Sequence, residues 1–369
     1  MRRSFTLLSD AGGTSKCHEK ALSWFIVELA QTSGGSTLSQ SAGILLVCIG
    51  YRTPPAGRRT SFRGGALNAD VRQLLRRLLR VIALVLLVPN FATAGPDEES
   101  ASTAVAQVHE ELWGIPSIIP MLAYMVRPVG DGPFPLLVMN HGVSLDPKER
   151  SFFPVIEFRD AALWFAKQGY VVVAPVRPGY GATAIEIPER GLFGLFFSGV
   201  GNCSDANFRD AGLAIASLNK WDIDYMSNQP FIKRDDVVVV GQSGGGWGAI
   251  ALASQNPTSV RAIIGFEAGR GGHYNGKPNN NCAPDRLVET VAQFGRTARI
   301  PMLWIYTHND SYFGPDLSMR LASAFRAAGG DVEYHLLPDF GEDGHFFIDS
   351  ADAVRIWAPL VSEFLRRHR

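Results

Sequence analysis

The chain has 369 residues, of which 46% are hydrophobic and 19% charged, so its composition excludes a disordered or repetitive chain. Its 38 glycines and 22 prolines are too few for a collagen-like fibre, and its four cysteines are too few for a scaffold built on disulfides. The formal net charge of +0 gives no sign of a nucleic-acid partner.

The zero net charge conceals two regions of opposite sign. Residues 1–80 contain twelve basic and four acidic side chains, a net charge of +8, whereas residues 95–369 contain 23 basic and 31 acidic side chains, a net charge of −8. Residues 81–94 between them have no charged side chain. This asymmetry indicates a basic leader in front of a mildly acidic body.

Residues 71–94 have the three-part pattern of a secretory signal peptide. Four arginines come first, eight apolar residues follow without interruption from Val81 to Val88, and Ala92-Thr93-Ala94 supplies the small residues of a cleavage site. The apolar run is far shorter than the ~20 residues that a membrane span needs, and Pro89 ends it. We therefore expect a secreted or periplasmic protein without a stable membrane anchor; a membrane anchor and a buried helix are the alternatives.

The 70 residues in front of this pattern are unexpected, because a signal peptide begins its chain. They show little sustained periodicity and are rich in Ser, Gly, Thr and Arg. We interpret residues 1–70 as an artefact of the gene model, with translation starting near Val71. A disordered N-terminal extension is the alternative.

Cys203 and Cys282 are the two cysteines of the body, residues 95–369. An even pair of cysteines in an exported protein is a candidate disulfide, and both lie in stretches rich in Gly and Asn. Two unpaired, partly buried thiols are the alternative. No close Cys/His spacing accompanies them, so the sequence does not indicate a zinc site or any other metal site.

From about Glu110, short apolar runs alternate with longer helical patterns. Continuous apolar runs indicate strands that are covered on both faces, as in a parallel sheet. The predicted strands, the first of them in an early hairpin, are Leu122–Val126, Pro135–Met139, Gly169–Val176, Val237–Val240, Ala262–Phe266, Met302–Tyr306 and Val332–Leu337. The predicted helices are Phe208–Leu218, Leu317–Ala327 and Val354–Leu365. This alternation predicts an α/β fold, a doubly wound, mostly parallel sheet with helices on both faces, whose functional residues follow the carboxyl ends of the strands.

The run Gly241-Gln242-Ser243-Gly244-Gly245 is a G-x-S-x-G sequence between four valines and a helix pattern rich in Gly and Ala. Small residues on both sides allow the tight, strained turn that holds a nucleophilic serine clear of a sheet. A Gly-rich turn that binds phosphate is the alternative. The G-K-[S/T] of a P-loop is absent from this run, so we predict that Ser243 is a nucleophile.

A serine nucleophile needs a base and an acid that orients the base. Asp310 follows the sixth predicted strand and is the predicted acid, with Glu267 as the second choice and a turn cap as the structural alternative. His345 lies in the loop after the last predicted strand and is the predicted base. The chain order Ser243, Asp310, His345 is typical of α/β-hydrolases.

The oxyanion that forms when the serine attacks needs two backbone N–H donors. Gly244 follows the nucleophile and supplies one. The loop Asn140–Ser144 follows an early strand and contains a His-Gly pair that resembles the oxyanion loop of the hydrolase fold, which places the second donor on Val143. Arg177–Gly181 resembles a second signature loop, whose Arg and Gly residues set the geometry of a turn.

Together these motifs resemble the α/β-hydrolase superfamily, and within it the dienelactone-hydrolase-like and related bacterial secreted serine esterases. The resemblance covers about Glu110 to Arg367 and implies one hydrolase domain over residues 95–369. Dienelactone hydrolases carry Cys as the nucleophile, whereas this chain has Ser243, which favours ordinary ester hydrolysis. The resemblance implies a small-molecule ester substrate, an acyl-enzyme and no metal or organic cofactor. A serine peptidase or amidase of the prolyl-oligopeptidase type and a non-catalytic binding protein are the alternatives.

We expect two insertions to shape the substrate pocket. Thr183–Asn202 is apolar and aromatic enough for a lid or an acyl-binding wall, with a loop packed on its own side chains as the alternative. Arg270–Pro284 is rich in Gly and Asn, and a Cys203–Cys282 bridge would join the two insertions over the site. Four further residues are expected to bind substrate or line the site: Trp247, Tyr312, His141 and His308.

Overall fold

The computed structural model describes residues 107–184 and 200–369. The predicted signal peptide (71–94), the residues in front of it and most of the insertion 183–202 lie outside the described residues. Within the described ranges, none of the helices combines the length and the apolar character that crossing a bilayer requires.

The described strands form one eight-stranded sheet in the order β1-β2-β4-β3-β5-β6-β7-β8. Strands β1 (Val108–Ile115) and β2 (Met121–Pro128) form an antiparallel hairpin, β2 pairs antiparallel with β4 (Val171–Pro175), and all further pairs are parallel. The other strands are β3 (Phe134–Asn140), β5 (Ile232–Gln242), β6 (Val260–Phe266), β7 (Met302–Thr307) and β8 (Val332–Leu337). Each predicted strand overlaps one of these, so the predicted mostly parallel sheet is confirmed; β1 was not predicted.

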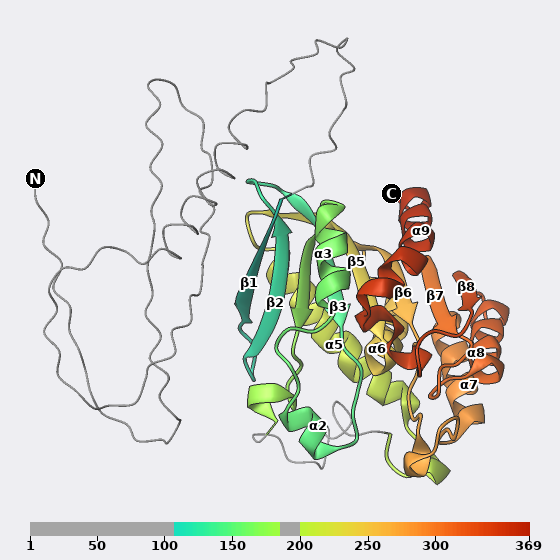
Figure 1. Cartoon of the computed structure of the whole chain (residues 1–369). Helices are drawn as coiled ribbons and strands as arrows, with labels where there is room; N and C mark the ends of the chain where they lie inside the picture. Colours follow the sequence, from blue (N-terminus) through green and yellow to red (C-terminus); the bar gives the residue numbers. More distant parts are fainter. Residues whose placement is uncertain (1–106, 185–199) are drawn as a thin grey trace, which may run out of the picture. The chain divides into compact units, whose positions relative to one another are not determined.

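Helices cover both faces of this sheet (Figure 1). One face packs against α3 (Arg159–Lys167) and α9 (Ala351–Arg367). The other packs against α5 (Phe208–Met226), α6 (Ser243–Ala253), α7 (Pro284–Gly295) and α8 (Pro315–Ala327). The shorter elements are α2 (Pro147–Ser151), η1 (Gly181–Thr183), η2 (Cys203–Asp205), η3 (Tyr274–Gly276) and η4 (Gly344–Asp349).

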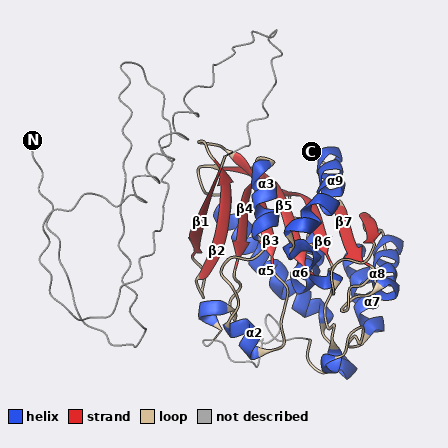
Figure 2. Cartoon of the chain, viewed as in Figure 1, coloured by secondary structure: helices blue, strands red, loops and turns tan. Residues whose placement is uncertain are grey.

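The four valines of β5 explain why the apolar runs are continuous. Val238 and Val240 belong to the core under α3 and α9, whereas Val237 and Val239 belong to the core on the opposite face. All four are fully buried, because successive side chains of a strand point to opposite faces and both faces are covered. Figure 2 shows the strands of the sheet between the two sets of helices.

The residues singled out from the sequence follow the carboxyl ends of the parallel strands. The carboxyl ends of parallel strands meet at one edge of a sheet, which is where ligands bind in this class of fold. Strands β3, β4, β5, β6, β7 and β8 are followed, respectively, by His141, Arg177, Ser243, Glu267, Asp310 and His345.

Candidate active site

Ser243 occupies a strained turn between β5 and α6. Its φ of 52° lies in the left-handed region, which costs free energy for a residue with a Cβ. Glycines make the close approach of the backbones possible: a Cβ on Gly241 would lie 2.5 Å from the carbonyl oxygen of Gly245, and one on Gly245 would lie 2.3 Å from that of Asn140. This is the strand–turn–helix context that the G-x-S-x-G pattern predicts.

Asp310 and His345 form a buried hydrogen-bonded pair. Nδ1 of His345 lies 2.9 Å from Oδ1 of Asp310, and their side chains are 4% and 0% exposed. The same carboxylate oxygen accepts the backbone N–H groups of Tyr312 at 2.8 Å and Phe313 at 3.1 Å. These contacts fix both the carboxylate and the tautomer of the imidazole, as an acid–base pair in catalysis requires.

Two contacts join the His345 loop to the rest of the site. The side-chain amide of Gln242, the residue before Ser243, donates to the backbone oxygen of His345 at 2.9 Å. The ring of Tyr312 stacks on the imidazole of His345, with 3.9 Å between the ring centroids, and on that of His273, with 3.6 Å. The structure thus brings Asp310 and His345 into contact and connects them to the turn that carries Ser243.

The loop after β3 lies directly beside Ser243. A Cβ on Gly142 would lie 3.3 Å from Cβ of Ser243, and one on Gly244 would lie 2.5 Å from Cγ2 of Val143. The buried guanidinium of Arg177 donates to the carbonyl oxygens of His141 at 2.7 Å and Gly142 at 2.6 Å. The carbonyl of Gly142 and the N–H of Val143 belong to one peptide group, and the two point in opposite directions in a trans peptide. Because Arg177 binds the carbonyl oxygen of Gly142, the N–H of Val143 points away from Arg177.

Two residues expected to bind substrate lie in the interior instead, which corrects those expectations. His141 is 2% exposed, its Nε2 accepts the backbone N–H of Arg177 at 3.1 Å, and its ring packs 4.2 Å from that of Phe153. Burial, and then the charge of Arg177, hold the pKa of His141 well below its usual value. Trp247 is fully buried because α6 is covered on every side, and its indole N–H donates to the carbonyl oxygen of Phe208 at 2.8 Å.

His308 is also not a wall of the site. It forms a hydrogen bond of 2.8 Å with Asp339, and both side chains are about two-thirds exposed, at 65% and 68%. An exposed pair of this kind contributes little to stability. The expectation that His308 lines the site is therefore corrected, because its side chain points to solvent.

A cavity of about 160 Å³ opens beside Ser243. Val143 and Gly244 line it next to the serine, and Tyr312 forms part of its wall. The cavity therefore brings the predicted nucleophile and both predicted oxyanion donors to one surface.

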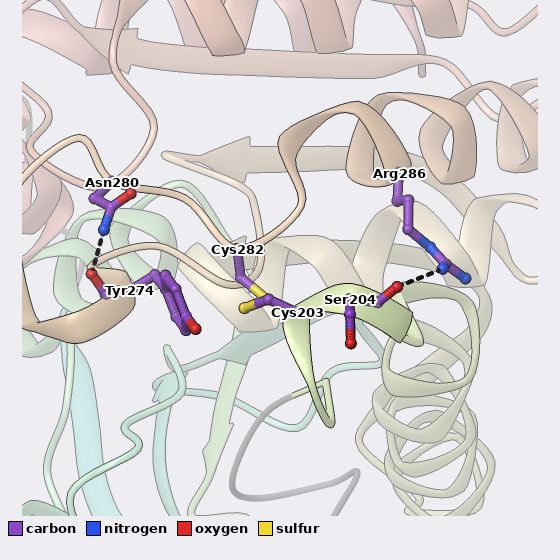
Figure 3. Close-up of a disulfide and its surroundings, with 6 residues drawn as sticks. All are labelled: Cys203, Ser204, Tyr274, Asn280, Cys282 and Arg286. Carbon is purple, nitrogen blue, oxygen red and sulfur yellow. Dashed lines mark hydrogen bonds between the residues drawn. A yellow bond between two sulfur atoms is a disulfide. The ribbon is translucent and has the colours of Figure 1, made fainter.

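The predicted disulfide between Cys203 and Cys282 is confirmed and also lines this cavity. It joins η2 to the segment in front of α7, as Figure 3 shows, across a sequence separation of 79 residues. The side-chain amide of Asn280 donates to the carbonyl oxygen of Tyr274 at 2.7 Å, and Arg286 donates to that of Ser204 at 3.4 Å. The bridge thus holds the insertion 270–284 against the segment 203–205.

Arg270, the first residue of the insertion expected to shape the pocket, lines the cavity, although its individual position there was not predicted. Its side chain is 2% exposed, and burial lowers its pKa to about 10. A Cβ on Gly244 would lie 3.0 Å from its Nη1, so the guanidinium approaches the turn of Ser243. The signal in the sequence that could have marked Arg270 as a site residue is its position as a charged residue within a run of glycines just past a predicted strand.

Glu267, the second choice for the catalytic acid, is fully buried at the end of β6. Its backbone has a φ of 44°, and its N–H donates to the carbonyl oxygen of Ile305 on β7 at 2.9 Å. Burial, and then the negative charge of Asp310, raise the pKa of Glu267 well above its usual value. The imidazole of His345 is hydrogen-bonded to Asp310, which favours Asp310 over Glu267 as its partner.

No protein-family model matches the sequence, and no curated protein does. Among solved structures, a protein described as a dienelactone hydrolase from Klebsiella pneumoniae is 19% identical, with 70% of this chain and 99% of that chain covered and a TM-score of 0.49. An acetyl xylan esterase from Paenibacillus is 16% identical, with 82% and 95% covered and a TM-score of 0.48. Dipeptidyl peptidase 4 from Porphyromonas gingivalis is 12% identical, with 70% and 35% covered and a TM-score of 0.50.

At 12% identity the likeness to the dipeptidyl peptidase concerns the fold alone, and this chain spans about a third of the length of that protein. The sheet order, the antiparallel hairpin at its start and the serine turn between β5 and α6 agree with that likeness. The described part of the chain has the α/β-hydrolase fold.

Proposed function

We propose that this protein is a serine hydrolase that cleaves carboxylic esters through Ser243, His345 and Asp310. The observation that carries the proposal is the buried hydrogen bond between His345 and Asp310. The loop of His345 is in turn hydrogen-bonded to Gln242, the residue before the strained Ser243. The order of the three residues and their positions after β5, β7 and β8 also support it.

In the proposed reaction, Nε2 of His345 takes the proton of the Ser243 hydroxyl as the serine oxygen attacks the ester carbonyl. Asp310 stabilises the imidazolium that forms. The C–O bond to the alcohol then breaks, and the alcohol leaves with the proton from His345. A water molecule, deprotonated by His345, attacks the acyl-enzyme and releases the acid and the free serine.

The N–H groups of Gly244 and Val143 are the proposed donors to the oxyanion. The contact between Gly244 and Val143 supports this assignment, because both residues line the cavity next to Ser243. Arg177 supports it as well. Its guanidinium donates to the carbonyl oxygens of His141 and Gly142, and this fixes the orientation of the peptide that carries the second donor.

The cavity size supports a short acyl group. Its volume of about 160 Å³ lies below the ~300–1,000 Å³ of pockets for drug-sized ligands.

Secretion is part of the proposal and is supported by the Cys203–Cys282 disulfide, because disulfides persist in oxidising compartments.

The test is hydrolysis of p-nitrophenyl acetate, butyrate and octanoate by the full chain, beside Ser243→Ala and the control Ser254→Ala. Ser254 is the C-cap residue after α6 and is not among the residues that line the cavity. We expect short esters to be preferred, and Ser243→Ala to lose nearly all of the ~10⁶-fold contribution of a triad to turnover. Hydrolysis of peptide anilides without hydrolysis of esters would replace the esterase by a peptidase, and full activity in Ser243→Ala would refute the nucleophile.

A further inference from the structure

Glu267 and Asp310, the hydrogen-bond partner of His345, have three buried carboxyl oxygens without a partner among the described residues. Both side-chain oxygens of Glu267 and Oδ2 of Asp310 have no hydrogen-bond partner within residues 107–184 and 200–369. The two residues are 0% and 1% exposed. They follow the neighbouring strands β6 and β7, which pair in parallel at Phe266 and Ile305. Glu267 has no part in the proposed reaction, so its burial here needs an explanation.

The surroundings of Glu267 disfavour a second negative charge. The charged groups that act on its carboxyl are all acidic: Asp310 after β7, Asp343 before η4, and Asp349 at the end of η4. A buried carboxylate without a cation or a hydrogen-bond donor is strongly unfavourable, and two adjacent carboxylates commonly share one proton. Of the pair, Asp310 has the donors that stabilise an anion, namely His345 and two backbone N–H groups.

The pattern of hydrogen bonds on Asp310 leaves Oδ2 available to accept a hydrogen bond from that proton. Oδ1 accepts from His345, Tyr312 and Phe313, whereas Oδ2 accepts from none of the described residues. A protonated Glu267 has one O–H to donate, and a carboxylate oxygen is the strongest acceptor that a neutral acid meets in a protein interior.

We infer that Glu267 is a neutral carboxylic acid that donates a hydrogen bond to Oδ2 of Asp310 and so positions the acid of the catalytic triad. This inference rests on the proposed function of Asp310. Glu267 touches neither substrate nor reacting atoms and is a positioning residue. Its hydrogen bond fixes the rotation of the Asp310 carboxylate and disperses part of its charge, which moderates the stabilisation of the imidazolium of His345.

The first test compares Glu267→Gln and Glu267→Leu with the wild type in kcat, KM and the pH profile of kcat/KM. The amide of Gln also donates a hydrogen bond and is uncharged, so we expect kcat and the midpoint of the acidic limb to stay at their wild-type values. Leu removes the donor; we expect kcat to fall roughly 10- to 100-fold with KM unchanged, and the midpoint to move to higher pH.

If Glu267 were ionised, the pH profile of Glu267→Gln would differ from that of the wild type. Replacing a carboxylate by Gln would then remove a negative charge near the imidazolium and move the acidic limb to lower pH. That shift in Glu267→Gln would overturn the inference, and so would a wild-type kcat and pH profile in Glu267→Leu.

The second test does not depend on activity. The infrared difference spectrum of wild type minus Glu267→Gln at neutral pH reads the carbonyl stretch of a protonated carboxylic acid, and we expect a positive band. Taking the difference removes the band of Glu157, whose pKa burial raises to about 8. Absence of the band would overturn the inference even if the ester assay succeeds, whereas a band together with an inactive wild type would count against the proposed function alone.

Discussion

Replacing Cys203 and Cys282 together by alanine removes a cross-link in the wall of the cavity beside Ser243. Cys282 is 4% exposed, and its backbone N–H donates to the carbonyl oxygen of Gly271 at 2.8 Å, so the bridge holds an ordered part of the insertion 270–284. Alanine is the suitable replacement, because a buried serine hydroxyl would add an unpaired polar group.

The size of the effect on stability follows from the length of the closed loop. A cross-link across a sequence separation of 79 residues removes loop-closure entropy worth about 4.5 kcal/mol from the unfolded chain. Measured contributions of disulfides are commonly about 2–4 kcal/mol. We therefore expect the free energy of unfolding of the double variant to fall by roughly 2–4.5 kcal/mol.

The assay is urea unfolding under non-reducing conditions, with Ser204→Ala as the matched control. Ser204 is exposed, and its substitution leaves the bridge intact. We also expect KM for a short ester to rise in the double variant, since both cysteines line the cavity. A double variant with the wild-type urea midpoint and KM would refute the reasoning, and so would a wild type whose midpoint is unchanged by a reductant that opens the bridge.

Three further predictions concern the site and its surroundings. Asp310→Asn should lower kcat for p-nitrophenyl acetate by about 10⁴-fold with little loss of folded protein, because the imidazole takes the wrong tautomer; an unchanged kcat would exclude Asp310 as the acid. Gly245→Ala should abolish the same activity and lower Tm in calorimetry, because its methyl group would lie 2.3 Å from the carbonyl oxygen of Asn140; wild-type activity would contradict the strained turn. Burial raises the pKa of Glu157 from 4.5 to about 8, so the folded state favours its protonated form and loses stability as pH rises through this range. Glu157→Gln should therefore raise Tm at pH 8 but not at pH 4.5, and an equal change at both pH values would contradict this.

The sheet and the serine turn were predictable because their causes are local. The valines of β5 are continuous since both faces of the strand are covered, and glycines flank Ser243 since the backbones approach within contact distance there. Strand β1 was missed because it is partly exposed and partly polar: Glu110 and Glu111 form ion pairs with Arg159 and Arg127, respectively. Charged residues and Gly114 interrupt its apolar residues, so the strand lacks the continuous apolar run that marks the others.

The pocket residues depended on the direction of side chains in the folded protein. Trp247 lies four residues after Ser243 in the sequence, but its indole packs between α5 and α7, away from the cavity. His141 lies two residues before Val143, but its ring and its carbonyl oxygen are hydrogen-bonded to Arg177 in the interior. Arg270 reaches the cavity from a loop that no periodicity marks. These directions follow from packing between distant segments, which local patterns do not encode.

Ser243 is the proposed nucleophile, activated by His345 and Asp310. The most direct test treats the folded chain with a fluorophosphonate, which phosphonylates activated serines, and locates the label by tandem mass spectrometry. We expect a single label on the peptide that contains Ser243, lost in Ser243→Ala and in His345→Ala and absent after prior unfolding. A label on another serine, or equal labelling of Ser243 in the unfolded chain, would contradict it.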